Sequence, residues 1–251
     1  MAQDTDQGIV ATSGDGLSAP VQVHARGELS RRLEQVTRVN LRPIASPLPI
    51  GFIGLAVATV LVAALNLGWI PATEGKAVAF ALLAFTVPTQ ATATVFGMLA
   101  RDGVGATGMG ILTGTWGTFG LVMLTSPKGA TSDALGILLI VSAICMFLVA
   151  TGAALGKIVP ALVLGGASLR FLTAGIYQLT ASTTWETITG VVGILLGAIA
   201  IYAAYAALLE GIQGRTVLPM GRRARGRQAV EGGLAEQVVD VTHEPGVRVQ
   251  L

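Results

Sequence analysis

The chain has 251 residues, of which 52% are hydrophobic and 12% are charged, and its mean hydropathy is +0.70. A soluble domain usually carries about twice that share of charge, so the composition excludes a water-soluble globule and indicates an integral membrane protein. Cys145 is the one cysteine, and the two histidines, His24 and His243, lie in the polar ends. An intramembrane enzyme would pair a nucleophile with a base, and no histidine lies in the apolar core. We therefore expect no disulfide framework, no catalysis, and no metal or other cofactor.

Both ends of the chain are polar, while its middle is apolar. Residues 1–43 hold few apolar runs and are predicted to form a flexible polar tail in the cytoplasm. Residues 212–251 begin with a basic cluster, Arg222 to Arg227, and then become acidic, so we expect a disordered second tail. A basic cluster can indicate nucleic acid, but one that follows an apolar stretch is more typical of an anchor for anionic lipid. Membrane lipid, and no nucleic acid, is the expected partner.

The apolar middle, residues 44–211, is predicted to be an all-α polytopic membrane domain, a bundle of six transmembrane helices. A bilayer core requires about 20 apolar residues per helix, and the continuous runs lack the alternation of a β-barrel strand. The predicted spans are Pro49–Trp69, Ala77–Ala100, Ala106–Leu124, Ala134–Leu155, Ile158–Leu179 and Ile188–Leu209. The break at Gly156-Lys157 is so short that helices four and five should be antiparallel neighbours.

An even number of spans places both tails on one side of the membrane. That side holds the arginines of the tails and the breaks at Arg101 and Lys157, whereas the opposite loops hold only Lys76 and Lys128. The positive-inside rule then predicts a multi-pass protein of the cell membrane (plasma or inner) with both termini in the cytoplasm. Five helices would divide the arginine-rich tails between the two sides, so the charge asymmetry favours six.

Arg170 is the one charged residue predicted to lie inside a span and not at its end. A charge at that depth costs roughly 2.5–3.5 kcal/mol even on the most lenient scale. No carboxylate occupies the middle of any predicted span. Arg170 therefore attracts an anion in an aqueous path, or its side chain reaches the outer headgroups, or helix five ends early. These interpretations stay open on the sequence alone.

Three uncharged features of the spans indicate how the helices pack. Gln90 shares a helix face with threonines, and a buried amide has four hydrogen-bonding positions to satisfy, so Gln90 is a candidate pore residue. Pro88 is expected to kink helix two. Gly110–Gly114 and Gly193–Gly197 are GxxxG pairs, which allow helices to approach closely within a protomer or between protomers.

Five short segments of the chain carry distinctive motifs. The first is Ser46-Pro47-Leu48-Pro49-Ile50-Gly51-Phe52, just before and at the start of the first span. The others are Asn66-Leu67-Gly68, Gly105-Ala106-Thr107, Thr115-Trp116-Gly117-Thr118-Phe119 and the tyrosine-containing run Ala200–Leu209. In this order they resemble the signatures of the acetate uptake transporter family (GPR1/FUN34/YaaH), whose first motif is Asn-Pro-Ala-Pro-Leu-Gly-Leu. At three positions the chain differs from the residue that the family usually has. Ser46 stands where the motif has Asn, Arg101 where the family has an acidic residue, and Arg170 where it has an apolar one, so the chain resembles a divergent member.

The resemblance implies a six-helix protomer with a solute path through its own bundle, assembled as a homo-hexamer. Its substrates would be acetate and similar small monocarboxylates, or succinate, moved with protons or as anions. The residues expected along that path are Ser46, Pro47, Pro49 and Gly51 at the entrance, Asn66, then Gln90, Thr113 and Trp116 at the narrow section, and Arg170 as an attractor of anions. Two other functions remain open: a transporter of a different small solute such as ammonium, and a non-transporting membrane scaffold.

Overall fold

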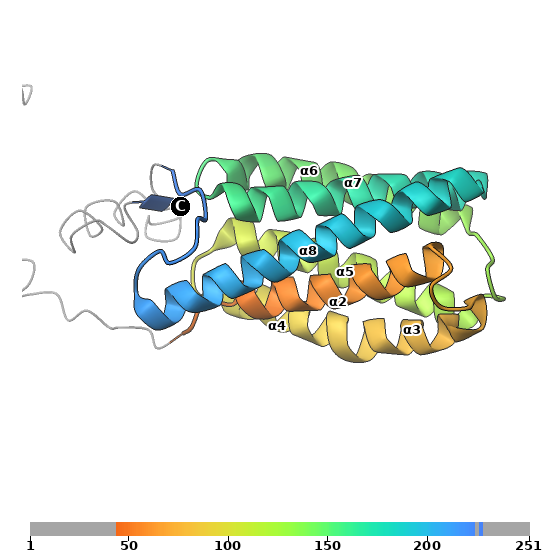
Figure 1. Cartoon of the computed structure of the whole chain (residues 1–251), viewed down its shortest axis with the longest axis horizontal. Coiled ribbons are helices and arrows are strands. Elements are labelled where there is room, and N and C mark those ends of the chain that lie inside the picture. The colour runs from red at the N-terminus through yellow and green to blue at the C-terminus, as the bar shows by residue number, and fades with distance from the viewer. Residues whose placement is uncertain (1–43, 224–225, 228–251) are drawn as a thin grey trace, which may run out of the picture. The chain divides into compact units, whose positions relative to one another are not determined.

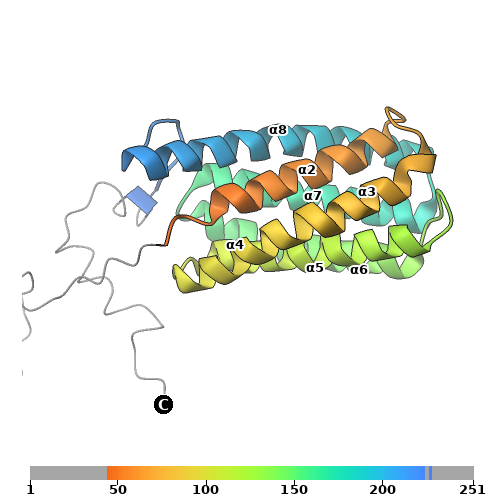
Figure 2. The ribbon, with the colours of Figure 1, turned by 90° about the horizontal axis from the view of Figure 1, so that it is seen from below.

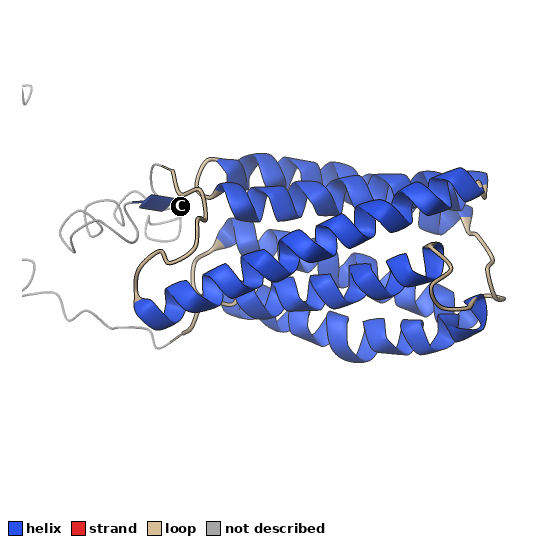
Figure 3. Cartoon of the chain, in the orientation of Figure 1, coloured by secondary structure: helices blue, strands red, loops and turns tan. Residues whose placement is uncertain are grey.

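The computed structural model describes residues 44–223, 226 and 227, all of which belong to one compact unit, Arg42–Gly233. The secondary structure of these residues is helical (Figures 1 and 3), apart from a single bridge between Lys157 and Arg222. The predicted all-α polytopic membrane fold is confirmed. The predicted tail 1–43, and residues 224, 225 and 228–251 of the second tail, lie outside the described residues.

The helices follow the predicted spans closely. They are α2 (Leu48–Asn66), a 3-10 turn (Ala72–Glu74), α3 (Gly75–Ala81), a π turn (Leu82–Thr86), α4 (Val87–Leu99), α5 (Gly103–Thr125), α6 (Asp133–Ala154), α7 (Ile158–Thr180) and α8 (Thr183–Gln213). The 3-10 turn, α3, the π turn and α4 form one continuous rod, so the described chain forms six rods. The last rod is longer than predicted at both ends, because Glu186 and Glu210 lie inside α8.

Five of the six rods are long and apolar enough to cross a membrane by length and composition, so the predicted count of six spans is one too high on this criterion. The exception is α5, which has 23 residues but contains seven glycines and five threonines. These residues lower the hydropathy of α5 although it carries no charged side chain. Figures 1 and 2 show α5 running along the other rods of the bundle.

The rods pack as antiparallel neighbours in the order of the chain, with one exception. α6 and α7 lie side by side and are joined by a short turn, as the break at Lys157 predicts (Figure 1). The exception is α8, which packs along α2 as well as along α7 (Figure 2). The last rod therefore returns to the first and closes the bundle.

The α6–α7 contact depends on two glycines that face each other. A Cβ on Gly175 would lie 2.7 Å from Cγ1 of Ile140 and 2.9 Å from the carbonyl oxygen of Gly136. Gly175→Leu should therefore lower the free energy of unfolding by roughly 1–3 kcal/mol, because the added side chain overpacks the interface. Thermal unfolding in detergent micelles measures the loss. Gly211→Leu is the matched control, since Gly211 of α8 is exposed and nothing lies within 4 Å of its Cβ position; equal midpoints for the two variants would contradict this packing.

Pro88 distorts its helix in the way its chemistry dictates. Proline has no amide hydrogen to donate, so a carbonyl one turn earlier loses its partner. The turn directly before α4 widens into the π turn Leu82–Thr86. The Thr89 hydroxyl lies 2.9 Å from the carbonyl oxygens of both Phe85 and Thr86 and donates to them. The Thr89 hydroxyl therefore adds hydrogen bonds within the distorted turn.

The two GxxxG pairs pack differently within the described part of the chain. Gly193 and Gly197 lie against α2, where added Cβ atoms would come within 2.9 Å of Ala63 Cβ and 2.5 Å of Val60 Cγ2. Gly114 is exposed and has nothing within 4 Å. Close packing by the Gly193–Gly197 pair explains how α8 approaches α2. Gly110 makes an ordinary contact with Thr94 of α4, with 3.4 Å between its Cβ position and Cγ2 of Thr94, so only Gly114 of that pair is open along α5.

The two ends of the bundle differ in charge. We call the end where α2 begins and α8 ends the tail end, and the opposite end the far end. Among the described residues, the basic side chains of the tail end are Arg101, Lys157, Arg215, Arg222, Arg223 and Arg227. The far end holds Lys76 and Lys128 together with the acidic Glu74, Asp133 and Glu186. The described part of the bundle thus carries the predicted asymmetry.

Candidate substrate path

Two cavities open at opposite ends of the bundle. The tail-side cavity has a volume of about 330 Å3, and its lining residues are Leu48, Phe52, Ala100, Arg101, Asp102, Val104, Gly105, Met109, Gly152, Ala153, Gly156, Lys157, Pro160, Leu164 and Gly226. The far-side cavity has a volume of about 130 Å3, and its lining includes Val62, Asn66, Lys76, Phe119, Val122, Lys128, Tyr177, Gln178 and Glu186. Both are walled by α2, α5, α6 and α7, so they lie within one set of helices.

The same helices run from one cavity to the other. On α5, Met109 lines the tail-side cavity and Phe119 the far-side cavity. Ten residues of α-helix rise about 15 Å, so about 15 Å of protein separates these two linings. On α2, Phe52 and Val62 bracket the same interval. The cavities are therefore stacked along one axis with a short closed section between them.

Aromatic side chains fill the closed section. The Trp116 ring packs edge-on against Phe119, with centroids 5.8 Å apart, and against Phe171 of α7, with centroids 5.6 Å apart. All three side chains are buried, as is Leu112, which precedes Trp116 by one helical turn. We call Trp116, Phe119 and Phe171 the aromatic plug. The indole nitrogen of Trp116 has no hydrogen-bond partner among the described residues, so the plug offers an unused donor inside an apolar wall.

The entrance motif lies beside the tail-side cavity, but its lining residues are not those predicted. Leu48 and Phe52 line the cavity, whereas Ser46, Pro47 and Pro49 do not. Ser46 is exposed and Pro47 is buried. Gly51 lies beneath Met109, whose sulfur would come within 2.5 Å of a Cβ at this position. The motif therefore contributes two apolar side chains and one close contact to the path.

Gln90 and Thr113 line neither cavity. Gln90 is fully buried beside Gly54 of α2, and within the described chain neither its amide oxygen nor its amide nitrogen has a partner. The Thr113 hydroxyl donates to the carbonyl oxygen of Met109 at 2.7 Å, within its own helix. Gln90 keeps the unsatisfied polar atoms that a path residue would use, and Thr113 does not.

Arg170 lies inside α7, which continues to Thr180, and its side chain is 2% exposed. The helix therefore does not end early, and the guanidinium is held within the bundle away from its surface. It lines neither cavity. Its Nη2 donates to Oδ1 of Asn66 at 3.3 Å, and Asn66 lines the far-side cavity. The predicted path residues Asn66 and Arg170 are thus brought together, with Asn66 in the wall of the far-side cavity and Arg170 behind it.

The far-side cavity also contains polar residues that the sequence alone did not single out. The Tyr177 hydroxyl donates to Oε1 of Glu186 at 3.3 Å, and Oε1 of Gln178 accepts from the backbone amide of Ser132 at 2.8 Å. Glu186 lies outside the predicted span Ile188–Leu209, and the structure places it in the first turn of α8. Tyr177 and Gln178 are adjacent polar residues near the end of a predicted span, and this pattern could have indicated a polar site. Only the antiparallel packing of α7 and α8 brings Glu186 to Tyr177.

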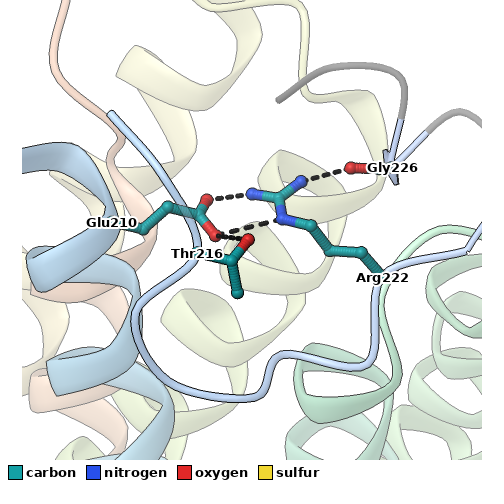
Figure 4. A network of polar contacts seen from close by, with 4 residues as sticks. All are labelled: Glu210, Thr216, Arg222 and Gly226. Carbon is teal, nitrogen blue, oxygen red and sulfur yellow. Dashed lines mark hydrogen bonds and ion pairs between the residues drawn. The ribbon is translucent and has the colours of Figure 1, made fainter. Parts of the chain in front are cut away.

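The residues after α8 fold back over the tail end of the bundle. We call residues 214–223 the strap. The backbone amides of Ile158 and Val159 donate to the carbonyl oxygens of Gly221 and Met220, and Met220 is 1% exposed. Figure 4 shows the Arg222 guanidinium between the Glu210 carboxylate and the Gly226 carbonyl oxygen. The described part of the second tail is therefore docked on the bundle, with Gly226 in the tail-side cavity wall.

The charge of Lys157 is disfavoured at this end of the bundle. Burial lowers the pKa of Lys157, the positive charge of Arg222 lowers it further, and the Asp102 carboxylate acts in the opposite direction. A lowered pKa in the folded state means that the unfolded state binds the proton more tightly. The contribution of Lys157 to stability therefore increases as the pH rises through the folded-state pKa toward 10.5.

Breaking the Glu210–Arg222 pair should release the strap. Glu210→Gln is expected to raise the rate at which maleimide labels Met220→Cys, in a Cys145→Ser background, by roughly tenfold, because one partner of a mostly buried ion pair is lost. Arg215→Ala is the control, since Arg215 is exposed and bonds to Gln213 on the outer side. Equal labelling rates with and without Glu210→Gln would show that the pair does not hold the strap.

Comparisons with known proteins agree with this arrangement. A family model described as the GPR1/FUN34/yaaH family matches residues 27–220, which is well over half of the chain. The solved chain described as "Structure of the bacterial acetate channel SatP" superposes with a TM-score of 0.62 at 25% sequence identity, over 70% of this chain and 99% of that one. No curated protein matches the chain. The chain therefore belongs to the GPR1/FUN34/yaaH family, whose members are membrane transport proteins and not enzymes.

Proposed function

We propose that this chain carries small monocarboxylates such as acetate across the cell membrane, through a path inside its own helix bundle. The observation that carries the proposal is the pair of stacked cavities, which share α2, α5, α6 and α7 and are separated by about 15 Å of packed protein that includes the aromatic plug. Family membership and the similarity to a channel described as an acetate channel support the substrate class.

The plug decides in which form a carboxylate would cross. Moving an isolated carboxylate into an apolar environment is far more costly than moving the neutral acid. Trp116, Phe119 and Phe171 offer one indole N–H and no charge. We therefore propose that the substrate enters the cavities as an anion and passes the plug as the neutral acid, so that transport is proton-linked.

The charges near the path favour an acid over ammonium. Arg170 holds a buried positive charge beside the far-side cavity, and Lys76 and Lys128 line that cavity. Positive charges along a low-dielectric path raise the local concentration of anions and repel cations. Glu186, the one carboxylate in the lining of that cavity, is engaged by the Tyr177 hydroxyl.

The orientation and assembly are part of the same proposal. The tail end carries most of the basic residues, so we place it in the cytoplasm. The exposed Gly114 of α5 would allow a neighbouring helix to pack closely. It supports a homo-oligomer, and the family resemblance suggests a hexamer.

Uptake of labelled acetate by proteoliposomes tests the proposal, with succinate and ammonium as competing solutes. We expect saturable, protein-dependent acetate uptake that unlabelled acetate reduces and ammonium does not. Uptake of ammonium without acetate would assign the path to another solute. The absence of flux for all three solutes would favour a membrane scaffold and would end the proposal.

A further inference from the structure

Arg170 is a buried cation without a counter-charge in the described part of the chain. Its side chain is 2% exposed, and no Asp or Glu of that part forms an ion pair with it. Its one hydrogen bond to another side chain goes to the neutral amide of Asn66, at 3.3 Å, and its Nε has no partner. A neutral acceptor does not compensate a unit charge in a low-dielectric interior. The electrostatic balance of this site therefore calls for an anion.

The guanidinium of Arg170 packs closely against the backbone of α8. A Cβ on Gly193 of α8 would lie 3.0 Å from Nε of Arg170 and 2.9 Å from Cβ of Ala63. Because Gly193 has no side chain, the guanidinium can lie between α2, α7 and α8. A larger residue at position 193 would displace the guanidinium.

A second unused donor lies one turn away. Thr189 precedes Gly193 by four residues, so the two share a face of α8. The Thr189 side chain is 1% exposed, and its hydroxyl has no partner within the described residues. The next residue, Gly190, packs against Asn66, with 3.3 Å between its Cβ position and Cβ of Asn66. Thr189 therefore lies at the level of the Arg170–Asn66 contact.

We infer that Arg170, Asn66 and Thr189 form a binding site for one small monovalent anion, buried at the inner edge of the far-side cavity. Asn66 lines that cavity and connects the site to it. One guanidinium balances one charge, and the far-side cavity that Asn66 lines, about 130 Å3 in volume, has room for a small anion such as a monocarboxylate or chloride. A dicarboxylate would bring a second charge that no described side chain at this place neutralises.

In the proposed transport function, on which this step of the inference rests, the site would hold the substrate anion before it passes the aromatic plug. Phe171 of the plug follows Arg170 directly in the chain, and Trp116 packs on Phe171. An anion bound at Arg170 would lie within one residue of the apolar section. It would leave this site when it gains a proton and its attraction to the guanidinium is lost.

Anion-dependent unfolding of the purified full-length chain tests the site. The thermal midpoint is measured in detergent micelles at constant ionic strength, with sulfate replaced stepwise by acetate or by chloride. We expect acetate to raise the midpoint of the wild-type protein along a saturable curve. In Arg170→Met the apparent affinity for acetate should fall by about 30-fold or more, because a buried charge pair loses one partner. In sulfate alone, Arg170→Met should unfold no earlier than the wild-type protein, since it removes an uncompensated charge.

Two further variants keep the test decisive if Arg170→Met does not fold. Thr189→Val should weaken acetate binding by about fivefold to tenfold, the value of one hydrogen bond. Thr187→Val is its matched control, because Thr187 lies on the same helix, is exposed and bonds to Thr183. Saturation by chloride as well as acetate would define a general monoanion site, and saturation by acetate alone a carboxylate site.

The inference is overturned if neither anion shifts the midpoint saturably, or if Thr189→Val and Arg170→Met bind acetate as the wild-type protein does. Its failure is distinguishable from that of the transport proposal. Acetate flux in proteoliposomes without saturable binding would reject this site alone, whereas saturable binding without flux would reject the transport function alone.

Discussion

Trp116→Ala is expected to open the path to larger acids. The Trp116 ring closes the section between the two cavities and contacts both other members of the plug. Removing the indole leaves space for the additional methylene groups of a longer acid. One methylene in an apolar pocket changes selectivity by roughly 10-fold or more, so we expect the ratio of butyrate to acetate uptake to rise at least about tenfold. Paired uptake measurements with the two labelled acids in proteoliposomes give this ratio.

Two variants control for general damage to the protein. Trp69→Ala removes the same side chain at a position that is 64% exposed at the far end, and it should leave the ratio unchanged. Trp116→Phe keeps an aromatic ring in the plug and should give an intermediate ratio. If Trp116→Ala transports the two acids in the wild-type ratio, the plug does not set the width of the path.

Acetate uptake should increase as the pH falls. The plug carries no charged side chain, so the neutral acid is the form that crosses it cheaply. Well above the pKa of a carboxylic acid, each unit of decrease in pH raises the neutral fraction about tenfold. We therefore expect the initial rate at a fixed total acetate concentration to rise by up to about tenfold per pH unit on the side of entry.

The measurement requires subtraction of leak through the lipid. Neutral acetic acid also crosses protein-free vesicles, so only the protein-dependent rate is compared between pH values. Asp102→Asn is a useful second variant, because Asp102 lies in the tail-side cavity and outside the plug, and it should keep the slope. A protein-dependent rate that does not change with pH would show that the anion itself crosses the plug.

The helical architecture could be predicted from the sequence because lipid selects for it strongly. Long apolar runs broken by Pro, Gly and charged residues can form only helices in a bilayer, and the bounds of α6 and α7 agree with the predicted spans to within one residue. The hydropathy of α5 shows the limit of this reasoning. Its glycines and threonines support close packing and polar contacts, and they also lower the signal by which a span is recognised.

The face that each helix turns to the path could not be predicted. A helix that is apolar on all sides carries no periodic pattern that marks one face. On α5, Thr113 and Trp116 are three residues apart, yet Trp116 forms the plug and Thr113 bonds to its own helix. In the entrance motif, Leu48 and Phe52 line the cavity while the prolines between and before them do not. Packing between helices far apart in the sequence decides these positions.

The docking of the strap on the bundle is a second feature that composition does not predict. Its polar and basic residues are typical of a disordered tail, yet Met220 is buried and the Tyr202 hydroxyl donates to the carbonyl oxygen of Pro219 at 2.9 Å. The pairing of Arg222 with Glu210 joins the strap to the last turns of α8 (Figure 4). These contacts depend on where α8 ends relative to α7, which the sequence does not state.

The claim that substrate passes through the bundle of one chain is tested most directly by blocking the far-side cavity. Val122 of α5 lines that cavity. In a Cys145→Ser background, Val122→Cys is modified with a negatively charged thiosulfonate reagent, and acetate flux is then measured. Thr131→Cys, exposed at the same end and outside the cavity lining, is the control. We predict that modification of Val122→Cys abolishes flux and that acetate slows the modification, while modified Thr131→Cys transports normally. Undiminished acetate flux through fully modified Val122→Cys would contradict a path through these cavities.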